Sequence, residues 1–361
     1  MDQHILPGVK SKDVAEAHLR DLLFQKEHGC KCMTYWIDEK RGNVFCLIEA
    51  PEKESVEDLH KNAHGLVPNR IIEVNDVLVQ SFLGRISDPE EAEVTDGLKV
   101  FSDPSFRILL VTHTADPLLL RYKLGIDVAN EMITQHNVVM KEQLSVYGGR
   151  EVELEGSAFV ASFTSANKAV ACAQAIQAAM HDTGLDQLST KIAVHGGQPV
   201  AGSDKLFGDT LRLAGYMCNM SSKSGIVISS TVRDIILKDQ PAQQQKNTRA
   251  LSTQDEILLD TMYRKLADNW RDDSFNVAQY CRELAMSKSQ LYRLSIALSG
   301  FPPNALLKDY RLEKAKELMK KKSYNISQVT FDCGFTSPSY FTKCFKKKYG
   351  LLPMTYLELL S

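Results

Sequence analysis

The feature that most constrains the fold is a local pattern that occurs twice in the last third of the chain. Residues 274–300 and 325–350 each read as a short amphipathic helix, a tight turn and a second helix rich in hydroxyl, amide, Arg and Lys side chains. This helix-turn-helix layout is suited to placing the second helix in the major groove of DNA. Two copies in one chain predict a reader of two adjacent groove segments.

The turn of the second segment has the chemistry that a helix-turn-helix requires. Gly334 ends the first helix, where a left-handed cap favours a residue without a Cβ. Ser337 is placed as an N-cap, and Pro338 takes the first position of the next helix. The apolar faces are expected from Ile326, Val329 and Phe331 on the first helix and from Tyr340, Phe341 and Phe345 on the second. The basic face of the second helix is expected from Lys343, Lys346, Lys347 and Lys348.

We expect nine side chains of the two second helices to face DNA. They are Ser287, Lys288, Gln290 and Arg293 in the first unit, and Ser337, Ser339, Thr342, Lys343 and Lys346 in the second. Arg293 and Gln290 are the expected base readers, because their forked ends match the edges of bases. The lysines are expected to hold phosphate groups.

Longer runs in the same region carry a family resemblance. The runs RLEKAKELM and CGFTSPSYFTKCFKKKYGLLP, with the closing Pro353, stand where the AraC/XylS regulator family has them, so that residues 251–361 resemble that family. The resemblance implies an all-α domain that binds double-stranded DNA in a transcription regulator. A helical domain with a solvated Lys face is the alternative, but it would not explain turn chemistry that occurs twice.

The charge of the chain is divided unevenly, although the formal net charge is only −2. From Asp255 onward there are 17 Lys and Arg against 12 Asp and Glu, so this end carries +5 and the rest carries −7. A basic end on an acidic body is typical of a DNA reader attached to a part that does not bind DNA. No apolar run approaches the roughly 18 residues of a membrane span, and the sequence starts without a secretion signal. These features predict a cytoplasmic protein without a membrane partner.

Residues 1–80 are expected to form a separate ferredoxin-like domain. The predicted order is a strand, a helix over 12–28, strands over 30–38 and 44–50, a helix over 55–64 and a strand over 70–74. The first helix is expected to bury the side that holds Val14, Leu19, Leu22 and Leu23. The order βαββαβ is the ferredoxin-like motif. The acidic stretch 88–103 reads as a linker.

Histidine is concentrated in this first part, which contains five of the nine in the chain. His60 and His64 are four residues apart on a predicted helix, so they share one face and could hold one metal ion. Cys30 and Cys32 alternate on one strand, and Cys46 lies on the next. Each residue alone has an ordinary structural alternative, because lone histidines are often hydrogen-bonded and cysteine is a common small core residue.

A second resemblance favours the metal. The segments YWID, VFCLIEAP and HKNAHGLVPNRIIEV, within residues 4–74, look like a small bacterial ferredoxin-like domain that has nickel-binding members. The residues that this resemblance points to are His4, Tyr35, Cys46, His60 and His64. Imidazole with a thiolate suits nickel, copper or zinc, and the sequence does not choose between these metals.

Residues 105–240 alternate between strands and helices, with a hairpin expected from 143–154 and 158–163. The runs LEGSAFVASF, KIAVHGGQPVAG, LFGDTLRLAGYM and SGIVISSTVRD resemble the class III adenylate and guanylate cyclase fold. Such cyclases hold two divalent ions with two carboxylates. The first is missing from RILLVTHT, and Ser157 stands at the second position. Arg212 and Tyr216 occupy the positions of the usual Asn and Arg, while Asp209 remains as a base-recognition position.

The sequence therefore predicts a multidomain α+β protein: a ferredoxin-like metal domain (1–80), a degenerate cyclase-like α/β domain (105–240), a polar linker (241–248) and an all-α DNA-binding domain (251–361). We expect a regulator that is not an enzyme, with no catalytic residues, and a homodimer through the first or middle domain. The middle domain is expected to be a packing module or a sensor of a small molecule or nucleotide. The alternatives are an active cyclase with a DNA-binding tail and a metal-sequestering protein.

Overall fold

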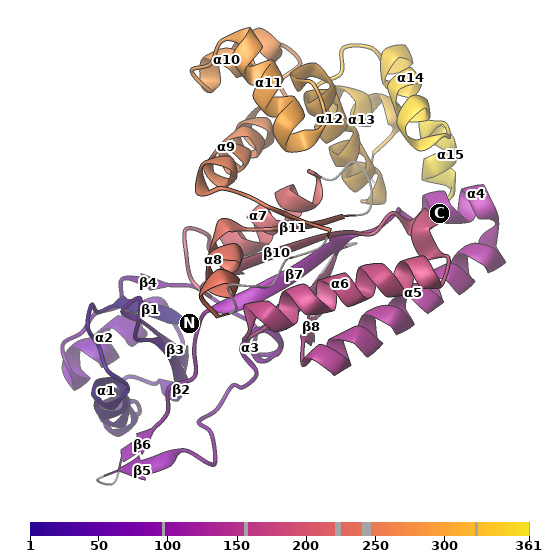
Figure 1. Cartoon of the computed structure of the whole chain (residues 1–361). Coiled ribbons are helices and arrows are strands. Elements are labelled where there is room, and N and C mark those ends of the chain that lie inside the picture. The colour runs from indigo at the N-terminus through magenta and orange to yellow at the C-terminus, as the bar shows by residue number, and fades with distance from the viewer. Residues whose placement is uncertain (96–97, 155–157, 221–224, 240–246, 322–323, 361) are drawn as a thin grey trace.

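The structure, a computed structural model, describes residues 1–361 except 96–97, 155–157, 221–224, 240–246, 322–323 and 361. It consists of a four-stranded sheet with two helices, a six-stranded sheet with helices on both faces, and a group of helices at the C-terminal end (Figure 1). Among the helices that can be described, none combines the length and the apolar character that crossing a membrane demands.

The four-stranded sheet is built from the first 71 residues. Its elements are β1 (Asp2–Ile5), α1 (Ser11–Phe24), β2 (Lys31–Asp38), β3 (Asn43–Glu49), α2 (Lys53–Ala63) and β4 (Arg70–Ile71). The strand order is β2-β3-β1-β4, and each neighbouring pair is antiparallel. The predicted succession of strand, helix, two strands, helix and strand is present, although β4 is much shorter than expected because the chain leaves the sheet after Ile71.

Alternation along the strands divides the side chains of this sheet between two cores. On the face covered by the helices, Tyr35 and Cys46 pack with Val14 of α1. On the other face, Trp36 and Phe45 join a core that continues through α3 (Asp76–Leu83) into the six-stranded sheet. The first sheet is therefore buried on both faces and shares its core with the rest of the molecule.

The stretch 88–103 is not the linker that its acidity suggested. It contains a hairpin of β5 (Glu93–Thr95) and β6 (Leu98–Val100), and the ring of Phe101 then stacks on Tyr35 with 4.1 Å between centroids. The reason is that apolar side chains are interspersed with the acidic ones and pack against the first sheet.

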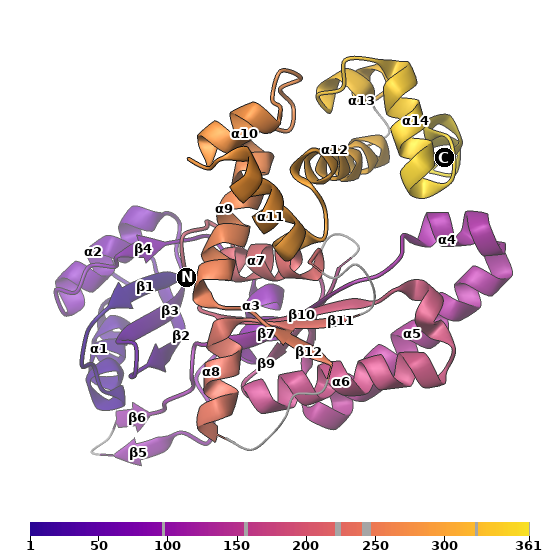
Figure 2. The same ribbon diagram turned by 45° about the horizontal axis from the view of Figure 1, so that its top comes forward.

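The six-stranded sheet has the order β12-β11-β10-β7-β9-β8. Its strands are β7 (Arg107–His113), β8 (Arg150–Val152), β9 (Phe159–Phe163), β10 (Lys191–Gly197), β11 (Gly225–Ile228) and β12 (Thr248–Ala250). Its helices are α4 (Pro117–Leu124), α5 (Ile126–Tyr147), α6 (Ala166–Asp182), the short 3-10 helix η1 (Leu185–Leu188), α7 (Gly208–Cys218) and α8 (Ser230–Asp239). Helices α5 and α6 cover one face and α7 covers the other (Figure 2).

The hairpin predicted from 143–154 and 158–163 is shorter than expected. Residues 143–147 belong to α5, which runs on until Gly148 ends it in the left-handed conformation. Only β8 remains of the first predicted strand, and it pairs with β9. The helix continues because its buried face, which includes Met140 and Leu144, packs on the sheet.

The C-terminal part contains seven helices among the described residues. They are α9 (Thr253–Asn269), α10 (Val277–Glu283), α11 (Lys288–Ser299), α12 (Pro303–Lys320), α13 (Ile326–Asp332), α14 (Pro338–Tyr349) and α15 (Pro353–Glu358). Helices α10 and α11 form the first predicted helix-turn-helix, and α13 and α14 form the second. The long α12 connects the two units (Figure 2).

The C-terminal helices are packed on α7 and α8, two helices of the six-stranded sheet. Most of the linker predicted at 241–248 lies outside the described residues, but Thr248 already belongs to β12, the edge strand that pairs with β11. Helix α9 then packs on α7, where the rings of Tyr263 and Tyr216 stack with 4.4 Å between centroids. The first helix-turn-helix therefore shares one hydrophobic core with the sheet.

Two glycines with similar backbone conformations test whether close packing, and not only a positive φ, requires glycine in the turn between α13 and α14. Gly334 has φ +70°, and a Cβ there would lie 2.5 Å from the carbonyl oxygen of Trp270. Gly300 has φ +75°, but a Cβ there would meet no atom within 4 Å. We expect Gly334→Ala to lower the free energy of unfolding by about 2–4 kcal/mol, since it adds a clash to the left-handed strain. Gly300→Ala should cost only about 1–2 kcal/mol. Urea denaturation measures both, and equal losses would contradict the clash.

Candidate metal centre and nucleic-acid interface

The candidate metal centre is formed around His60, where three elements of the first sheet meet. His60 lies on α2 with 1% of its surface exposed. Its Nε2 lies 2.9 Å from Oδ2 of Asp2 on β1, and its Nδ1 lies 3.2 Å from Oδ1 of Asp21 on α1. The residues converge because α1 and α2 pack side by side on the same face of the sheet that holds β1.

Two overlapping groups of possible metal ligands are present here. Ligand atoms of Asp2, His4, Cys46 and His60 all lie within 4.8 Å of one another. Ligand atoms of Asp21, His60 and His64 form the second group at the same separation. Strand pairing explains the first group, because Asp2 is directly opposite Cys46 and His4 follows on the same face of β1. Nitrogen, oxygen and sulfur donors together suit a transition metal rather than calcium or magnesium.

Without a metal, a proton on His60 offsets part of the negative charge of the cluster. Burial lowers the pKa of His60, but its hydrogen bonds to Asp2 and Asp21 outweigh burial and raise that pKa to about 10. Burial raises the pKa of Asp21, but the hydrogen bonds with His60 and His64 hold it at about 2. An imidazolium on His60 therefore bridges two carboxylates. A bound cation would replace that proton, so the donor set fits a divalent metal.

Of the residues to which the resemblance points, the structure places Tyr35 apart from the cluster. His4, Cys46, His60 and His64 lie in the two groups, whereas Tyr35 packs between Phe101 and the edge of His18. Burial raises the pKa of Tyr35 to about 12, which opposes the phenolate that a metal would require.

Sequence reasoning missed the two carboxylates of the cluster. Asp21 lies on the buried face of α1 with Val14 and His18, whereas Leu19 and Leu23 are exposed, so the predicted face of this helix was right for Val14 but wrong for these two leucines. Burial of these polar groups is possible because His18 pairs with Asp88 and Asp21 pairs with the α2 histidines. The signal was present, since residues 14, 18 and 21 share one helix face and Asp2 shares a strand face with His4.

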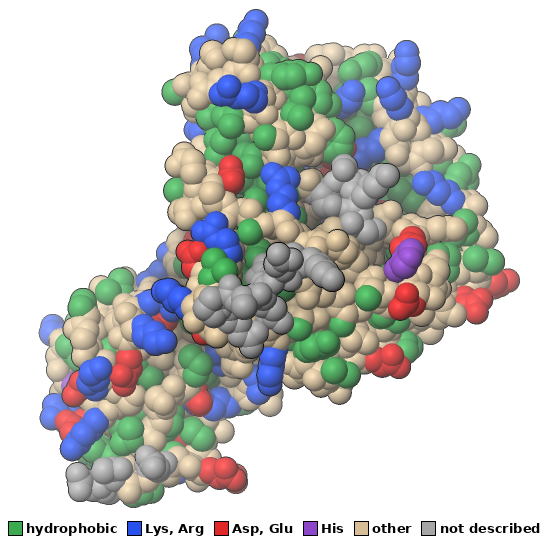
Figure 3. All heavy atoms as spheres, in the orientation of Figure 1, with side chains coloured by type: hydrophobic (Ala, Val, Ile, Leu, Met, Phe, Trp, Pro, Cys, Tyr) green, Lys and Arg blue, Asp and Glu red, His purple; other side chains and the backbone are tan. Residues whose placement is uncertain are grey.

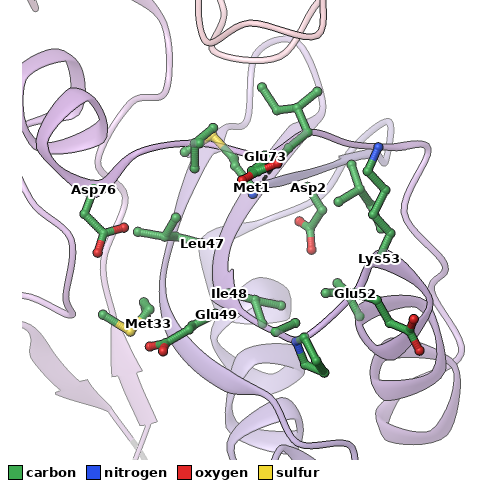
Figure 4. A pocket seen from close by; sticks show the side chains of 16 residues that line it. Met1, Asp2, Met33, Leu47, Ile48, Glu49, Glu52, Lys53, Glu73 and Asp76 are labelled. Atoms are coloured by element: carbon green, nitrogen blue, oxygen red, sulfur yellow. Dashed lines mark hydrogen bonds between the residues drawn. The ribbon is translucent and has the colours of Figure 1, made fainter.

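A cavity of about 370 Å³ lies next to the metal cluster (Figure 4). Asp2 lines it from β1, and further carboxylates surround it. They are Glu49, Glu52, Glu73 and Asp76. Lys53 also lines the cavity, but the carboxylates outnumber it, so the lining is acidic and includes one member of the metal cluster.

Each candidate DNA-reading helix begins at a serine cap, and the sequence predicts the one at Ser337. The side chain of Ser287 caps α11 by accepting a hydrogen bond from the backbone N–H of Gln290 at 3.2 Å. Ser337 caps α14 in the same way through the N–H of Tyr340 at 3.4 Å. Of the nine expected DNA-facing side chains, the partly buried ones are Ser337 and Thr342. The exposed ones are Ser287, Lys288, Gln290, Arg293, Ser339, Lys343 and Lys346.

Three side chains of the second unit differ from the expected faces. Phe331 and Tyr340 are each more than half exposed rather than buried, because their positions point away from the packed sides of α13 and α14. Lys348 is not on a free basic face, since its Nζ lies 2.5 Å from Asp309 and 2.8 Å from Glu313 of α12. Figure 3 shows basic side chains along the outer edge of the helical part, over α10 and α14.

Helix α12 fixes the offset between the two units. Its Arg311 donates to the backbone carbonyls of Trp270 and Asp272 ahead of the first unit, at 2.9 and 2.6 Å. Its Leu312 and Ala315 belong to the core of the second unit.

The positions that resemble a cyclase site are engaged in packing. Arg212 pairs with Asp209 at 2.6 Å and with Asp260 of α9 at 3.3 Å, and Tyr216 stacks on Tyr263. Ser157 lies outside the described residues. Helix α7 therefore uses these positions to hold the C-terminal helices.

Comparison with known families agrees with both ends of the chain. Residues 280–358 match the family described as helix-turn-helix domain, and residues 1–74 match the family described as nickel responsive protein SCO4226-like. The C-terminal part of the chain is therefore a helix-turn-helix domain, the kind that its resemblance to the AraC/XylS family predicts.

Individual relatives of the chain match it over limited stretches. A stretch of 106 residues is 36% identical to histidine kinase P4 of Formosa agariphila and covers 29% of this chain and 8% of that protein. A stretch of 112 residues is 30% identical to the probable transcriptional regulator LumQ of Photobacterium leiognathi and covers 30% of this chain and 45% of that protein. The chain thus spans less than half of either relative. A solved adenylate/guanylate cyclase/hydrolase from Silicibacter pomeroyi is 23% identical, with a TM-score of 0.33, over 38% of this chain and 83% of that one.

The pairing between α12 and α14 in the AraC-type domain predicts a pH dependence of its stability. Burial raises the pKa of Glu313, but Lys348 and Lys316 outweigh burial and hold it at about 2. Because the folded-state pKa is below the ordinary value, the ionised group stabilises the fold above about pH 4.5 and loses this effect as the pH falls toward 2. We expect Glu313→Gln to flatten the fall of the urea midpoint over this range, measured by circular dichroism. Glu317→Gln, an exposed change on the same helix, should leave the wild-type profile intact.

Proposed function

We propose that this protein is a transcriptional regulator that binds double-stranded DNA through its AraC-type domain and responds to a transition metal through its N-terminal part. The observation that carries the proposal is the pair of capped reading helices, α11 and α14, whose expected contact residues are mostly exposed. The proposed domains are residues 1–80, 105–240 and 251–361. The strand order β2-β3-β1-β4 supports a ferredoxin-like class for the first, and the second is proposed to be cyclase-like.

Two readers in one chain support recognition of two neighbouring major-groove segments. Arg293 and Gln290 on α11 are exposed and carry the forked donors that match base edges. Lys343 and Lys346 on α14 are exposed and suited to phosphate. Because Arg311 and the core of the second unit hold α12 to both sides, the spacing of the two half-sites should be fixed.

Substitutions in the reading helices should separate base reading from phosphate binding. We expect Arg293→Ala to cost about 1–3 kcal/mol of binding free energy and to relax sequence preference at one base pair. Lys346→Ala should weaken binding to all sequences and reduce the salt slope by about 1. The measurement is fluorescence anisotropy of the full chain with duplexes selected from a random pool, at several salt concentrations. Lys141→Ala on α5 is the control and should bind as wild type does. The proposed interface would be contradicted if both reading-helix variants bound DNA as tightly as wild type.

The metal is proposed to bind at Asp2, His4, Cys46 and His60, with Asp21 and His64 adjacent. The support is the convergence of these donors within 4.8 Å and the match of residues 1–74 to a nickel-responsive family. When bound, a divalent cation would supply the positive charge that His60 otherwise carries between Asp2 and Asp21. Nickel, zinc and copper all remain compatible with this donor set.

The acidic cavity supports a path by which a cation reaches the buried cluster. Asp2 is 1% exposed, and the cavity that His4, Cys46, His60 and His64 themselves line measures only about 60 Å³. The cavity in Figure 4 reaches Asp2 from a rim that includes Glu49, Glu52 and Glu73. A negative rim raises the local concentration of cations and disfavours anions.

Substitution of histidines inside and outside the cluster should distinguish metal ligands from structural residues. We expect the change His60→Ala with His64→Ala to abolish stoichiometric uptake of nickel or zinc, measured by titration calorimetry. This variant also leaves Asp2 and Asp21 without a cation, which costs about 3–5 kcal/mol, so its fold must be checked. His4→Ala keeps the Asp2–His60–Asp21 pairs and should still weaken metal binding at least tenfold. His28→Ala, which lies near Asn62 outside both groups, is the control. Unchanged titrations in the His4 variant and the double variant would contradict the site.

A polar path is available to transmit the state of the metal centre. Arg70 is paired in register with Gln3 of β1, between Asp2 and His4. Its guanidinium bonds the carbonyls of Ala201 and Gly202. The N–H of Gly202 donates to Asp209 at 2.7 Å, and Asp209 holds Arg212, which reaches Asp260 of α9. Metal binding that moves β1 would therefore displace contacts that end on the helix before the first reader.

A nucleotide cyclase is the alternative that the middle part suggests. The engagement of Arg212 by Asp209 and Asp260 and the stacking of Tyr216 favour a structural role for those positions. We infer that the protein is not an enzyme and that the six-stranded sheet joins the metal part to the DNA-binding part. Homodimerisation through the first or middle domain remains a prediction.

A further inference from the structure

A separate cavity of about 230 Å³ lies in the middle part, between β7 and α5. It is remote in sequence from the metal cluster and shares none of its residues. Its lining consists of Thr112, Thr114, Ala115, Pro117, Ile133, His136, Asn137, Phe159 and Leu188. The size suits a molecule smaller than most drugs, since typical ligand pockets measure about 300–1,000 Å³.

Two buried polar atoms that line this cavity have no partner among the described residues. They are Oγ1 of Thr112, which is 1% exposed, and Nε2 of His136, which is 7% exposed. An unpaired buried polar group costs about 1–3 kcal/mol, so two at one cavity are unfavourable unless something pairs with them. Thr112 reaches the cavity because it follows Leu110 on the face of β7 that α5 covers, and His136 is on the buried face of α5.

The contacts of His136 define what it offers to an occupant. Its Nδ1 lies 3.3 Å from Oδ1 of Asn137, an atom that can only accept, which favours the tautomer with the proton on Nδ1. In that tautomer Nε2 is a lone-pair acceptor, and it has no donor among the described residues. Burial lowers the pKa of His136, which favours this neutral form. The hydroxyl of Thr112 can either donate or accept.

The rest of the lining excludes a charged occupant. The walls are apolar, from Phe159, Leu188 and Ile133, and none of the described lining residues carries a fixed charge. We propose that this cavity binds a small neutral molecule with one hydroxyl or N–H donor on a compact apolar body, with the donor paired to Nε2 of His136 and the polar end beside Thr112.

The cavity is joined to the DNA-binding part through Asp116. Ala115 and Pro117, on either side of Asp116, line the cavity. The carboxylate of Asp116 accepts a hydrogen bond from the N–H of Leu118 at the start of α4. It also accepts from Nζ of Lys316 on α12 at 3.2 Å and from the hydroxyl of Tyr356 on α15 at 3.1 Å.

Packing reinforces the same connection. Leu119 of α4 belongs to the hydrophobic core of the second helix-turn-helix, together with Phe341 and Phe345 of α14. Both views show α4 beside the C-terminal end of the chain (Figures 1 and 2). An occupant that fixes residues 114–117 would therefore bias the position of the second reader. This regulatory consequence rests on the proposed DNA binding, whereas the cavity proposal does not.

Direct binding measurements on the full chain test the cavity. The probes are phenol, which has a hydroxyl donor, and anisole, in which a methyl group replaces the hydroxyl hydrogen. Binding of each probe is measured by ligand-observed saturation-transfer NMR. We expect phenol to bind at least fivefold more tightly than anisole. The change Thr112→Val with His136→Leu should weaken phenol at least tenfold while the protein stays folded, because both unpaired polar groups are replaced by apolar ones of similar size.

A matched control uses a different cavity of the middle part, beside α6. The hydroxyl of Thr190 is also buried without a partner, but it lines a cavity beside α6 that does not include Thr112 or His136. Thr190→Val should leave phenol binding unchanged. The proposal is overturned if phenol and anisole bind alike, if neither binds, or if the double variant binds phenol as wild type does. If neither phenol nor anisole binds, the polar atoms of Thr112 and His136 are paired by water only.

The regulatory consequence has its own readout. Saturating phenol should change the affinity of wild type for its DNA duplex at least fivefold, a modest allosteric coupling. Asp116→Ser keeps an N-cap for α4 but removes the charge that holds Lys316, so phenol should still bind while its effect on DNA falls below twofold. Phenol binding without any effect on wild-type DNA affinity would overturn the coupling. A chain that binds no DNA at all would overturn the proposed function, and the NMR result would then decide the cavity by itself.

Discussion

The packing of α9 on α7 is the contact on which the arrangement of the whole chain depends. The stacked rings of Tyr216 and Tyr263 and the pairing of Arg212 with Asp260 attach the C-terminal helices to the sheet. Because this contact is largely buried, the first reader is part of the same hydrophobic core as Phe207 and Trp36. A rearrangement anywhere in that core can therefore reach the reading helix without a flexible tether.

The same contact bears on the proposal that the middle part is cyclase-like but inactive. If the middle part is cyclase-like, Arg212 and Tyr216 of α7 stand at positions that would face a nucleotide. In this structure α9 covers both positions. Arg212 has its guanidinium neutralised by two carboxylates, and Tyr216 presents a ring face to another ring. The face of α7 that holds these residues is therefore an internal interface, and such an interface needs complementary packing rather than open space.

Much of the fold could be predicted from the sequence, because local signals and tertiary contacts agree there. The cap at Ser337 and the left-handed Gly334 are set by neighbours in sequence, and they are found where the turn chemistry places them. The face of α1 could not be predicted from hydrophobicity alone. Asp21 can be buried because His60 and His64, about forty residues later, lie within 3.2 Å of its carboxylate.

The same limit explains the parts of the site that were found and those that were not. The histidines of α2 stand out by their spacing, whereas Asp2 looks like an ordinary residue near the start of a strand until β1 is paired with β3. Thr112 and His136 could not be recognised at all, since a threonine in a strand and a histidine in a helix are unremarkable until no partner is found for either.

The two proposed inputs reach different halves of the DNA-binding part, and this has a mechanical consequence. The path from the metal cluster through Arg70 and Arg212 ends on α9, beside the first reader. The path from the cavity through Asp116 ends on α12 and α15, beside the second. A double-groove site is bound tightly only when both readers are in register, since a misplaced reader loses its own contacts and strains those of its neighbour. Two ligands that each adjust one reader would therefore act on a single quantity, the offset between α11 and α14, and neither would need to contact DNA.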